Sequence, residues 1–223
     1  MSMDKGTLYI VSTPIGNLED ITLRAIHILK EVDLIAAEDT RKSKILLGNY
    51  NIQTPLTSYH SYNIAHKTGG LVGEILQGKN IAIISDSGTP GISDPGSLLI
   101  SECIKKDIPV VAIPGPTALI TALTVSGKPT HKFVFEGFLS NKSARRKKQL
   151  EALKQEERTV IIYESPHRII KFLEDFIEVF GDRELVIARE LTKKFEEIKR
   201  SKASLLLEHF STNKPRGEFI VIF

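Results

Sequence analysis

The chain has 223 residues, of which 41% are hydrophobic and 26% charged, a composition typical of a globular protein with one large or two small domains. No apolar run approaches the roughly 18 residues that a membrane span requires. The first apolar run ends at Thr13-Pro14 and is too short for the core of a signal peptide. The only cysteine, Cys103, lies among apolar residues and predicts a buried thiol in a reducing compartment. We therefore expect a cytoplasmic protein with no membrane partner.

Positive charge is concentrated in the second half of the chain. The formal net charge is only +3, which does not by itself indicate a nucleic-acid partner. Residues 145–148 nevertheless form an unbroken basic run, and further lysines and arginines cluster at 193–194 and 199–202. The first 130 residues contain no basic group of comparable density.

The first half of the sequence alternates short apolar runs with amphipathic segments. Four runs are predicted to be strands: 7–12, 33–37, 80–84 and 108–113. They are apolar almost throughout, as in strands covered on both faces, and therefore predict a mostly parallel sheet flanked by helices. Asp20 is expected to cap the helix after the first strand, and Asp94 to cap a helix with Pro95 in its first turn.

Loops rich in glycine and proline follow three of these strands, at 13–17, 85–93 and 114–117. Ligands of open parallel sheets bind beyond the carboxyl ends of the strands. Glycine lets a backbone approach a ligand closely, and proline stiffens the loop around it. A single loop of this kind often marks only a turn, but three on one sheet edge predict a ligand site.

The second half is predicted to be a separate α/β domain. The segment 127–130 (GKPT) is typical of a hinge, which gives domains of 1–127 and 128–223. The second domain is expected to contain a mixed sheet with helices, built from strands 133–138, 159–163, 185–188 and 219–223 and helices 143–156 and 169–180. Phe172, Phe176 and Phe180 recur at helical spacing and indicate a core-facing stripe rather than a base-stacking surface.

Common fingerprints of other chemistries are absent from the sequence. It contains no GxGxxG, GxxxxGK[ST], HExxH, GxSxG or CxxC motif. The six histidines do not pair with cysteines or carboxylates at metal-ligand spacing, so we expect no metal site. The missing GxGxxG also disfavours a nicotinamide or flavin oxidoreductase, one of the alternative functions.

Eight characteristic segments occur in order along the chain: TPIGNLEDITLRA, AAEDTRKSKILL, SDSGTPGISDPG, IPGPTALITALTVSG, EGFL, YESPHR, ARELTKKFEE and RGEF. In these segments, over about residues 7–223, the chain resembles the tetrapyrrole methylase superfamily, and most closely its branch that methylates ribosomal RNA. The resemblance implies a homodimeric enzyme with S-adenosylmethionine bound between two α/β domains. It also implies methylation of the ribose 2′-hydroxyl of a cytidine in the decoding region of small-subunit ribosomal RNA.

The resemblance places the cofactor contacts in the three loops and at two positions beyond them. The residues are Pro14, Ile15, Gly16, Gly88, Thr89, Pro90, Ile92, Thr117, Ala118 and Tyr163. Walls of backbone and apolar groups suit a sulfonium, whose positive charge disappears as the methyl leaves. Relatives that modify tetrapyrroles carry an acidic residue where this chain has Thr89. Relatives of the RNA branch commonly continue into a helical tail, whereas this chain ends at RGEFIVIF.

A ribose hydroxyl is a poor nucleophile, so methyl transfer to it requires a positioned base or cation. The cluster Glu38-Asp39-Thr40-Arg41 after the second strand supplies candidates. We expect Asp39 to act as base or orienting group, and Arg41 as the partner of a phosphate or oxyanion. The same cluster is consistent with a helix N-cap and a local ion pair, or with a carboxylate that holds a cofactor ribose.

Contacts with the RNA are expected from the basic run and the YESPHR motif, at Arg145, Arg146, Lys147, Lys148, Glu164, His167 and Arg168. Without the resemblance, the basic run is equally consistent with a solvated helix face. The remaining alternatives are methylation of a tetrapyrrole ring carbon and a non-catalytic RNA-binding module. The basic run, YESPHR and Asp39-Thr40-Arg41 favour RNA over a tetrapyrrole.

Overall fold

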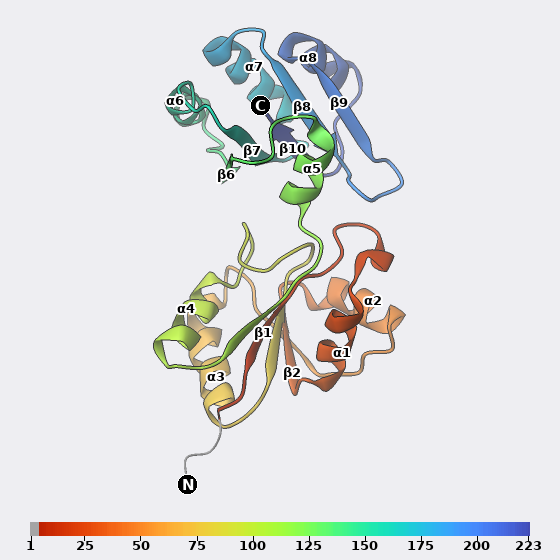
Figure 1. Cartoon of the computed structure of the whole chain (residues 1–223), viewed down its shortest axis with the longest axis vertical. Helices are drawn as coiled ribbons and strands as arrows, with labels where there is room; N and C mark the ends of the chain where they lie inside the picture. Colours follow the sequence, from red (N-terminus) through yellow and green to blue (C-terminus); the bar gives the residue numbers. More distant parts are fainter. Residues whose placement is uncertain (1–4) are drawn as a thin grey trace. The chain divides into compact units, whose positions relative to one another are not determined.

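In the computed structural model, which describes residues 5–223, the strands form two five-stranded sheets in two separate units (Figure 1). The first unit ends at Thr117 and the second is Ala118–Phe223. The helix α5 (Ala118–Ser126) therefore groups with the second unit. No helix within residues 5–223 combines the length and the apolar composition needed to span a bilayer.

The first sheet is entirely parallel, as the continuous apolar runs predict. Its order is β3-β2-β4-β1-β5. The strands are β1 (Leu8–Val11), β2 (Leu34–Ala37), β3 (Leu56–Ser58), β4 (Ile81–Ile84) and β5 (Val110–Ile113). The four expected strands are confirmed. The three-residue β3 and the helix after it, α3 (Ile64–Leu76), were not predicted, because the strand is too short for its pattern to stand out.

Helices cover both faces of this sheet, with α1 (Leu23–Glu31) and α2 (Thr40–Asn49) on one face and α3 and α4 (Ser97–Lys105) on the other (Figure 1). Successive strand residues point to opposite faces. Ile35 and Ala37 therefore pack under α1 and α2, whereas Ala36 packs under α3 and α4. Cys103 of α4 is buried, as predicted, and burial raises the pKa of its thiol to about 11.

Two predicted helix caps are wrong. Asp20 lies in a short 3₁₀ turn (Leu18–Asp20), and Thr22 caps α1 by accepting a hydrogen bond from the backbone N–H of Ala25 at 3.1 Å. Asp94 caps no helix, because α4 begins only at Ser97. Residues 93–96 form a turn and not a helix, since Ser93 has φ +63° and Gly96 has φ +148°, both outside the helical region.

The second sheet is mixed, as predicted, with order β6-β7-β10-β8-β9. Its strands are β6 (Phe133–Phe138), β7 (Thr159–Glu164), β8 (Glu184–Arg189), β9 (Glu197–Lys202) and β10 (Phe219–Ile222). Only β6 and β7 pair in parallel; β10 pairs antiparallel with β7 and β8, and β8 with β9. The strand β9 was not predicted because its sequence, EIKRSK, is charged, which suits an exposed sheet edge.

One face of this sheet carries the main core of the second unit, under α6 (Ser143–Ala152), α7 (Ile169–Phe180) and α8 (Ala203–Thr212). Phe172 and Phe176 of α7 are fully buried there and Phe180 is partly buried, which confirms the core-facing stripe. The helix α5 contacts β7, β8 and β10 of the same unit.

Arg146 of α6 lies inside this core and not on the surface. Its side chain is 2% exposed, its Nε donates to Asp175 Oδ2 at 2.8 Å, and its other nitrogens donate to the carbonyls of Ser140 and Lys171. Ser143 Oγ donates to the second oxygen of Asp175 at 2.8 Å. Every charge of the pair is thus hydrogen-bonded, which is the condition under which a buried ion pair is tolerated.

Arg146→Ala is expected to lower the free energy of unfolding of this unit by about 3–5 kcal/mol, because it leaves the Asp175 carboxylate buried without a cation. Urea unfolding followed by circular dichroism measures the loss. The matched control is Lys147→Ala, which removes a neighbouring cation whose pair with Glu178 is at the surface. Equal, small effects of the two substitutions would show that the buried pair does not hold α6 on α7.

Candidate functional site

Backbone hydrogen bonds join the loop after β1 to the loop after β4 at the carboxyl edge of the first sheet. The N–H of Thr13 donates to Gly88 O at 2.8 Å, and the N–H of Gly88 donates to Thr13 O at 3.0 Å. Gly88 has φ +82°, and a Cβ there would lie 3.4 Å from the Ile15 side chain. A residue with a side chain would be strained at this position, so the exchange of bonds depends on glycine.

A chain of hydroxyl groups joins these two loops to the third one. Thr89 Oγ1 lies 2.8 Å from Ser12 Oγ and 2.9 Å from Thr117 Oγ1, and it is 3.2 Å from the carbonyl oxygen of Pro116. Ser12 follows β1, Thr89 follows β4, and Thr117 follows β5. The predicted convergence of the three glycine- and proline-bearing loops at one sheet edge is therefore confirmed.

The third loop approaches the first so closely that only glycine fits at position 115. A Cβ on Gly115 would lie 2.9 Å from Ser12 Cβ, closer than packed carbon atoms come. The residues expected to hold the cofactor in this unit, 14–16, 88–90, Ile92 and Thr117, include no ionised side chain. Backbone groups, hydroxyls and apolar atoms thus make up these walls, which fits a ligand with a positive sulfonium.

Asp39 and Arg41 form a local pair at the start of α2. Asp39 is the N-cap, and its carboxylate accepts from the Arg41 backbone N–H at 2.9 Å and from the guanidinium Nε and Nη2 at 3.0 and 2.8 Å. The side-chain hydrogen bond from Arg41 holds the pKa of the Asp39 carboxyl well below its usual range. Such a carboxylate is a weak proton acceptor, so the geometry supports an orienting role for Asp39 more than that of a base.

Asp86, which was not singled out from the sequence, links this charged loop to the loop after β4. Its Oδ1 accepts from the Asp39 backbone N–H at 2.9 Å, and its Oδ2 lies 2.7 Å from Lys42 Nζ. Glu38 accepts from the Asp86 backbone N–H at 3.3 Å, and burial raises the pKa of Glu38. The only sequence signal for this role was the position of Asp86 directly beyond a buried strand.

Within the second unit, Tyr163 lies beside the start of α5, close to the expected contact Ala118. Its hydroxyl oxygen accepts from the backbone N–H of Leu119 at 3.1 Å. The ring packs edge-on against Phe135 and Phe138, with centroids 4.8 and 5.7 Å apart. Tyr163 is therefore held by both its ring and its hydroxyl.

The residues expected to contact RNA differ in how they are placed. Glu164 is buried and turned inward, where its carboxylate lies 3.0 Å from Arg168 Nε, and burial raises the pKa of Glu164. It can orient Arg168 but is not placed to touch a large substrate. The expected RNA contact of Arg146 is also wrong, because its guanidinium is paired with Asp175 inside the core. His167 is exposed.

Two residues of the basic run border a hollow in the second unit. Arg145 and Lys148 line it together with Phe138, Ser140 and Gln149. Lys147, by contrast, pairs with Glu178 at 2.7 Å. The accessible positive charge of α6 is therefore centred on Arg145 and Lys148.

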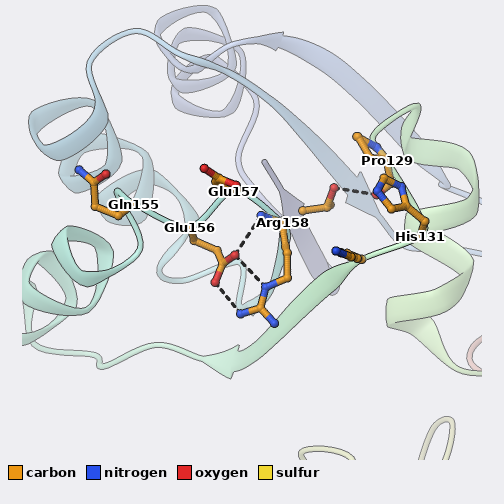
Figure 2. Close-up of a pocket in the computed structure, with 8 residues that line it drawn as sticks. Pro129, His131, Gln155, Glu156, Glu157 and Arg158 are labelled. Atoms are coloured by element: carbon orange, nitrogen blue, oxygen red, sulfur yellow. Dashed lines mark hydrogen bonds and ion pairs between the residues drawn. The ribbon is translucent and has the colours of Figure 1, made fainter.

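A second hollow of this unit lies at the amino ends of β6 and β7 (Figure 2). Four of its lining residues bond to one another in two pairs. The Glu156 carboxylate accepts from the Arg158 guanidinium at 2.8 and 2.7 Å and from the Arg158 backbone N–H at 2.9 Å (Figure 2). Thr159 donates to Pro129 O at 2.7 Å. Among the residues that the structure describes, no group of three or more acidic, histidine or cysteine side chains is placed to bind a metal ion.

Two curated relatives match this chain almost from end to end. The Ribosomal RNA small subunit methyltransferase I of Synechocystis sp. is 50% identical over 218 residues, which are 97% of this chain and 78% of that protein. The protein of the same name from Thermotoga maritima is 48% identical over 217 residues, 97% of both chains.

Among solved structures, the uroporphyrin-III C-methyltransferase from Thermus thermophilus, complexed with S-adenyl homocysteine, shares the fold. It is 17% identical, with a TM-score of 0.68 over 97% of both chains. Residues 7–206 match the family model of the Tetrapyrrole (Corrin/Porphyrin) Methylases. With this match, and with a parallel sheet, a mixed sheet and three converging loops as expected, the chain belongs to the tetrapyrrole methylase family.

Proposed function

We propose that this chain takes a methyl group from S-adenosylmethionine and places it on the ribose 2′-hydroxyl of a cytidine in small-subunit ribosomal RNA. Relatives that are about half identical over nearly the whole chain are named for this class of substrate. A structure of the same fold holds S-adenyl homocysteine, which is what remains of the methyl donor after transfer. The runner-up substrate, a tetrapyrrole, rests on family membership alone.

The observation that carries the proposal is the convergence of three glycine- and proline-bearing loops at the carboxyl edge of the first sheet, where the expected cofactor contacts carry no ionised side chain. S-adenosylmethionine supplies an activated methyl group on a sulfonium. An enzyme gains rate only from interactions that are stronger in the transition state than in the ground state. A carboxylate beside the sulfonium would stabilise the charge that disappears, whereas the hydroxyls of Ser12, Thr89 and Thr117 do not.

We assign Arg41 the contact with an RNA phosphate or with the oxygen that gains negative charge. Its side chain is 89% exposed and points out from α2, and Asp39 holds the guanidinium at two atoms. Partial burial raises the pKa of Glu38, so it keeps its proton to higher pH than an exposed glutamate. Glu38 is therefore the alternative to Asp39 as the group that accepts the proton of the ribose hydroxyl.

Phosphates of the RNA are assigned to Arg145, Lys148 and Arg168. Arg145 and Lys148 stand one helical turn apart and border the same hollow, so both can reach one stretch of backbone. We further propose that the enzyme acts in the cytoplasm, where small-subunit assembly provides the substrate. The proposal that it is a homodimer rests on the family resemblance.

Label transfer tests the proposed reaction. Small ribosomal subunits from a strain that lacks the enzyme are incubated with the purified protein and methyl-tritiated S-adenosylmethionine. We expect label in the RNA and, on mapping, at a cytidine 2′-oxygen. Label in a uroporphyrinogen-type substrate but not in the subunit would favour the tetrapyrrole reaction, and RNA binding with no transfer would favour a non-catalytic binding module.

Thr89→Val is expected to weaken binding of S-adenosylmethionine by roughly tenfold, because it removes hydroxyl bonds of about 1 kcal/mol each that hold three loops together. Isothermal titration calorimetry gives the dissociation constant. The control is the same substitution at an exposed position, Thr212→Val at the end of α8. Unchanged affinity in Thr89→Val would remove Thr89 from the binding site.

Arg145→Gln and Lys148→Gln are each expected to flatten the salt dependence of RNA binding by about 0.7–0.9 in slope, since each loses one phosphate contact. Binding to small subunits is measured from about 50 to 200 mM salt. Lys147→Gln serves as the control on the same helix because Lys147 is paired with Glu178. If all three substitutions change the slope equally, α6 acts only as a diffuse basic surface.

A further inference from the structure

Phe138 exposes a large aromatic side chain at the carboxyl end of β6. The side chain is 53% exposed, although the strand belongs to a packed sheet. The exposure follows from a bulge, because the pairing of β6 with β7 shifts register between Phe135 and Gly137. Gly137 has φ +61°, a conformation that glycine adopts easily. Bulges of this kind re-aim a side chain, and here the residue directly after the bulge is the exposed phenylalanine.

The exposed ring is supported on one side by a second aromatic ring. It packs edge-on against Tyr163 at 5.7 Å and 64°. Tyr163 in turn packs against Phe135 and accepts a hydrogen bond from Leu119, so the support is itself fixed. A rigid, solvent-facing aromatic ring is the element that single-stranded nucleic-acid binders use to stack a base.

Two cations stand beside the ring. Arg145 and Lys148 line the hollow together with Phe138, and both are exposed. Over residues 5–223 neither forms an ion pair, in contrast to Lys147. The hollow is held together by Gln149, whose Oε1 accepts from the Ser140 backbone N–H at 2.8 Å and so joins α6 to the segment after β6.

We propose that this hollow binds one unpaired nucleotide of the RNA substrate, with its base on the Phe138 ring and its phosphate between Arg145 and Lys148. The inference rests on the proposed function, to which it adds a substrate feature. Proteins that recognise single-stranded RNA combine stacking on aromatic rings with cations along the backbone. A base inside a duplex is already stacked on its neighbours and cannot offer its face to Phe138.

The test compares substitutions of Phe138 in the full chain. Phe138→Ala and Phe138→Leu are expected to weaken binding of a fluorescein-labelled single-stranded oligoribonucleotide of about 12 nucleotides by roughly tenfold, the scale of one base–aromatic stack. Phe138→Tyr keeps the ring and should bind within about twofold of the unsubstituted chain. Phe195→Ala removes another exposed phenylalanine, 65% exposed, and should bind unchanged.

Two further readouts separate stacking from other roles. Binding of a duplex of the same length should be equally strong in Phe138→Ala and the unsubstituted chain, and the salt slope should not change, because no charge is lost. The circular dichroism spectrum and the urea unfolding midpoint should also be unchanged, which controls for folding.

The proposal is overturned if Phe138→Ala binds the single strand as well as the unsubstituted chain does, or if Phe138→Leu binds as well as Phe138→Tyr. Both results are compatible with methyl transfer to small subunits, so they would leave the proposed function intact. Failure of the unsubstituted chain to label small subunits would instead contradict the proposed function itself.

Discussion

The Thr89 hydroxyl group is where three loops of the first sheet meet. One hydroxyl can donate one hydrogen bond and accept others, which lets it contact Ser12, Thr117 and the Pro116 carbonyl at the same time. These partners follow strands that are far apart in sequence but adjacent in the sheet, as β4, β1 and β5 are. An acidic residue at position 89 would place a charge among these hydroxyls. The uncharged network therefore determines both the shape of the site and the kind of ligand it suits.

Much of the fold could be predicted because burial on both faces leaves a clear mark on a sequence. Runs such as IAII and LIAA have no polar alternation, and they became the parallel strands β4 and β2. The caps of α1 and α4 could not be placed, because Asp20 and Thr22 are both good caps and only the local backbone decides between them. The charged strand β9 was missed because an edge strand owes its place to neighbours that the sequence does not show.

The candidate site was predictable where backbone geometry demanded particular residues, and much less so where side chains choose their partners. Gly88 and Gly115 marked these loops because the positive φ of Gly88 strains any residue with a side chain, and a Cβ at position 115 would clash with Ser12. Arg146 and Lys148 look alike in the run RRKK, yet one is in the core and the other at the surface. The helical period separates them, but which face of α6 packs on α7 is known only from the structure. Asp86 and Phe138 were missed for the same reason.

A crystal structure with S-adenosylhomocysteine bound tests the central claim most directly. The account predicts that the ligand contacts residues 14–16 and 88–92, and that the hydroxyls of Ser12, Thr89 and Thr117 remain linked. A ligand bound away from these loops, or loops that separate so that the three hydroxyls no longer meet, would contradict it.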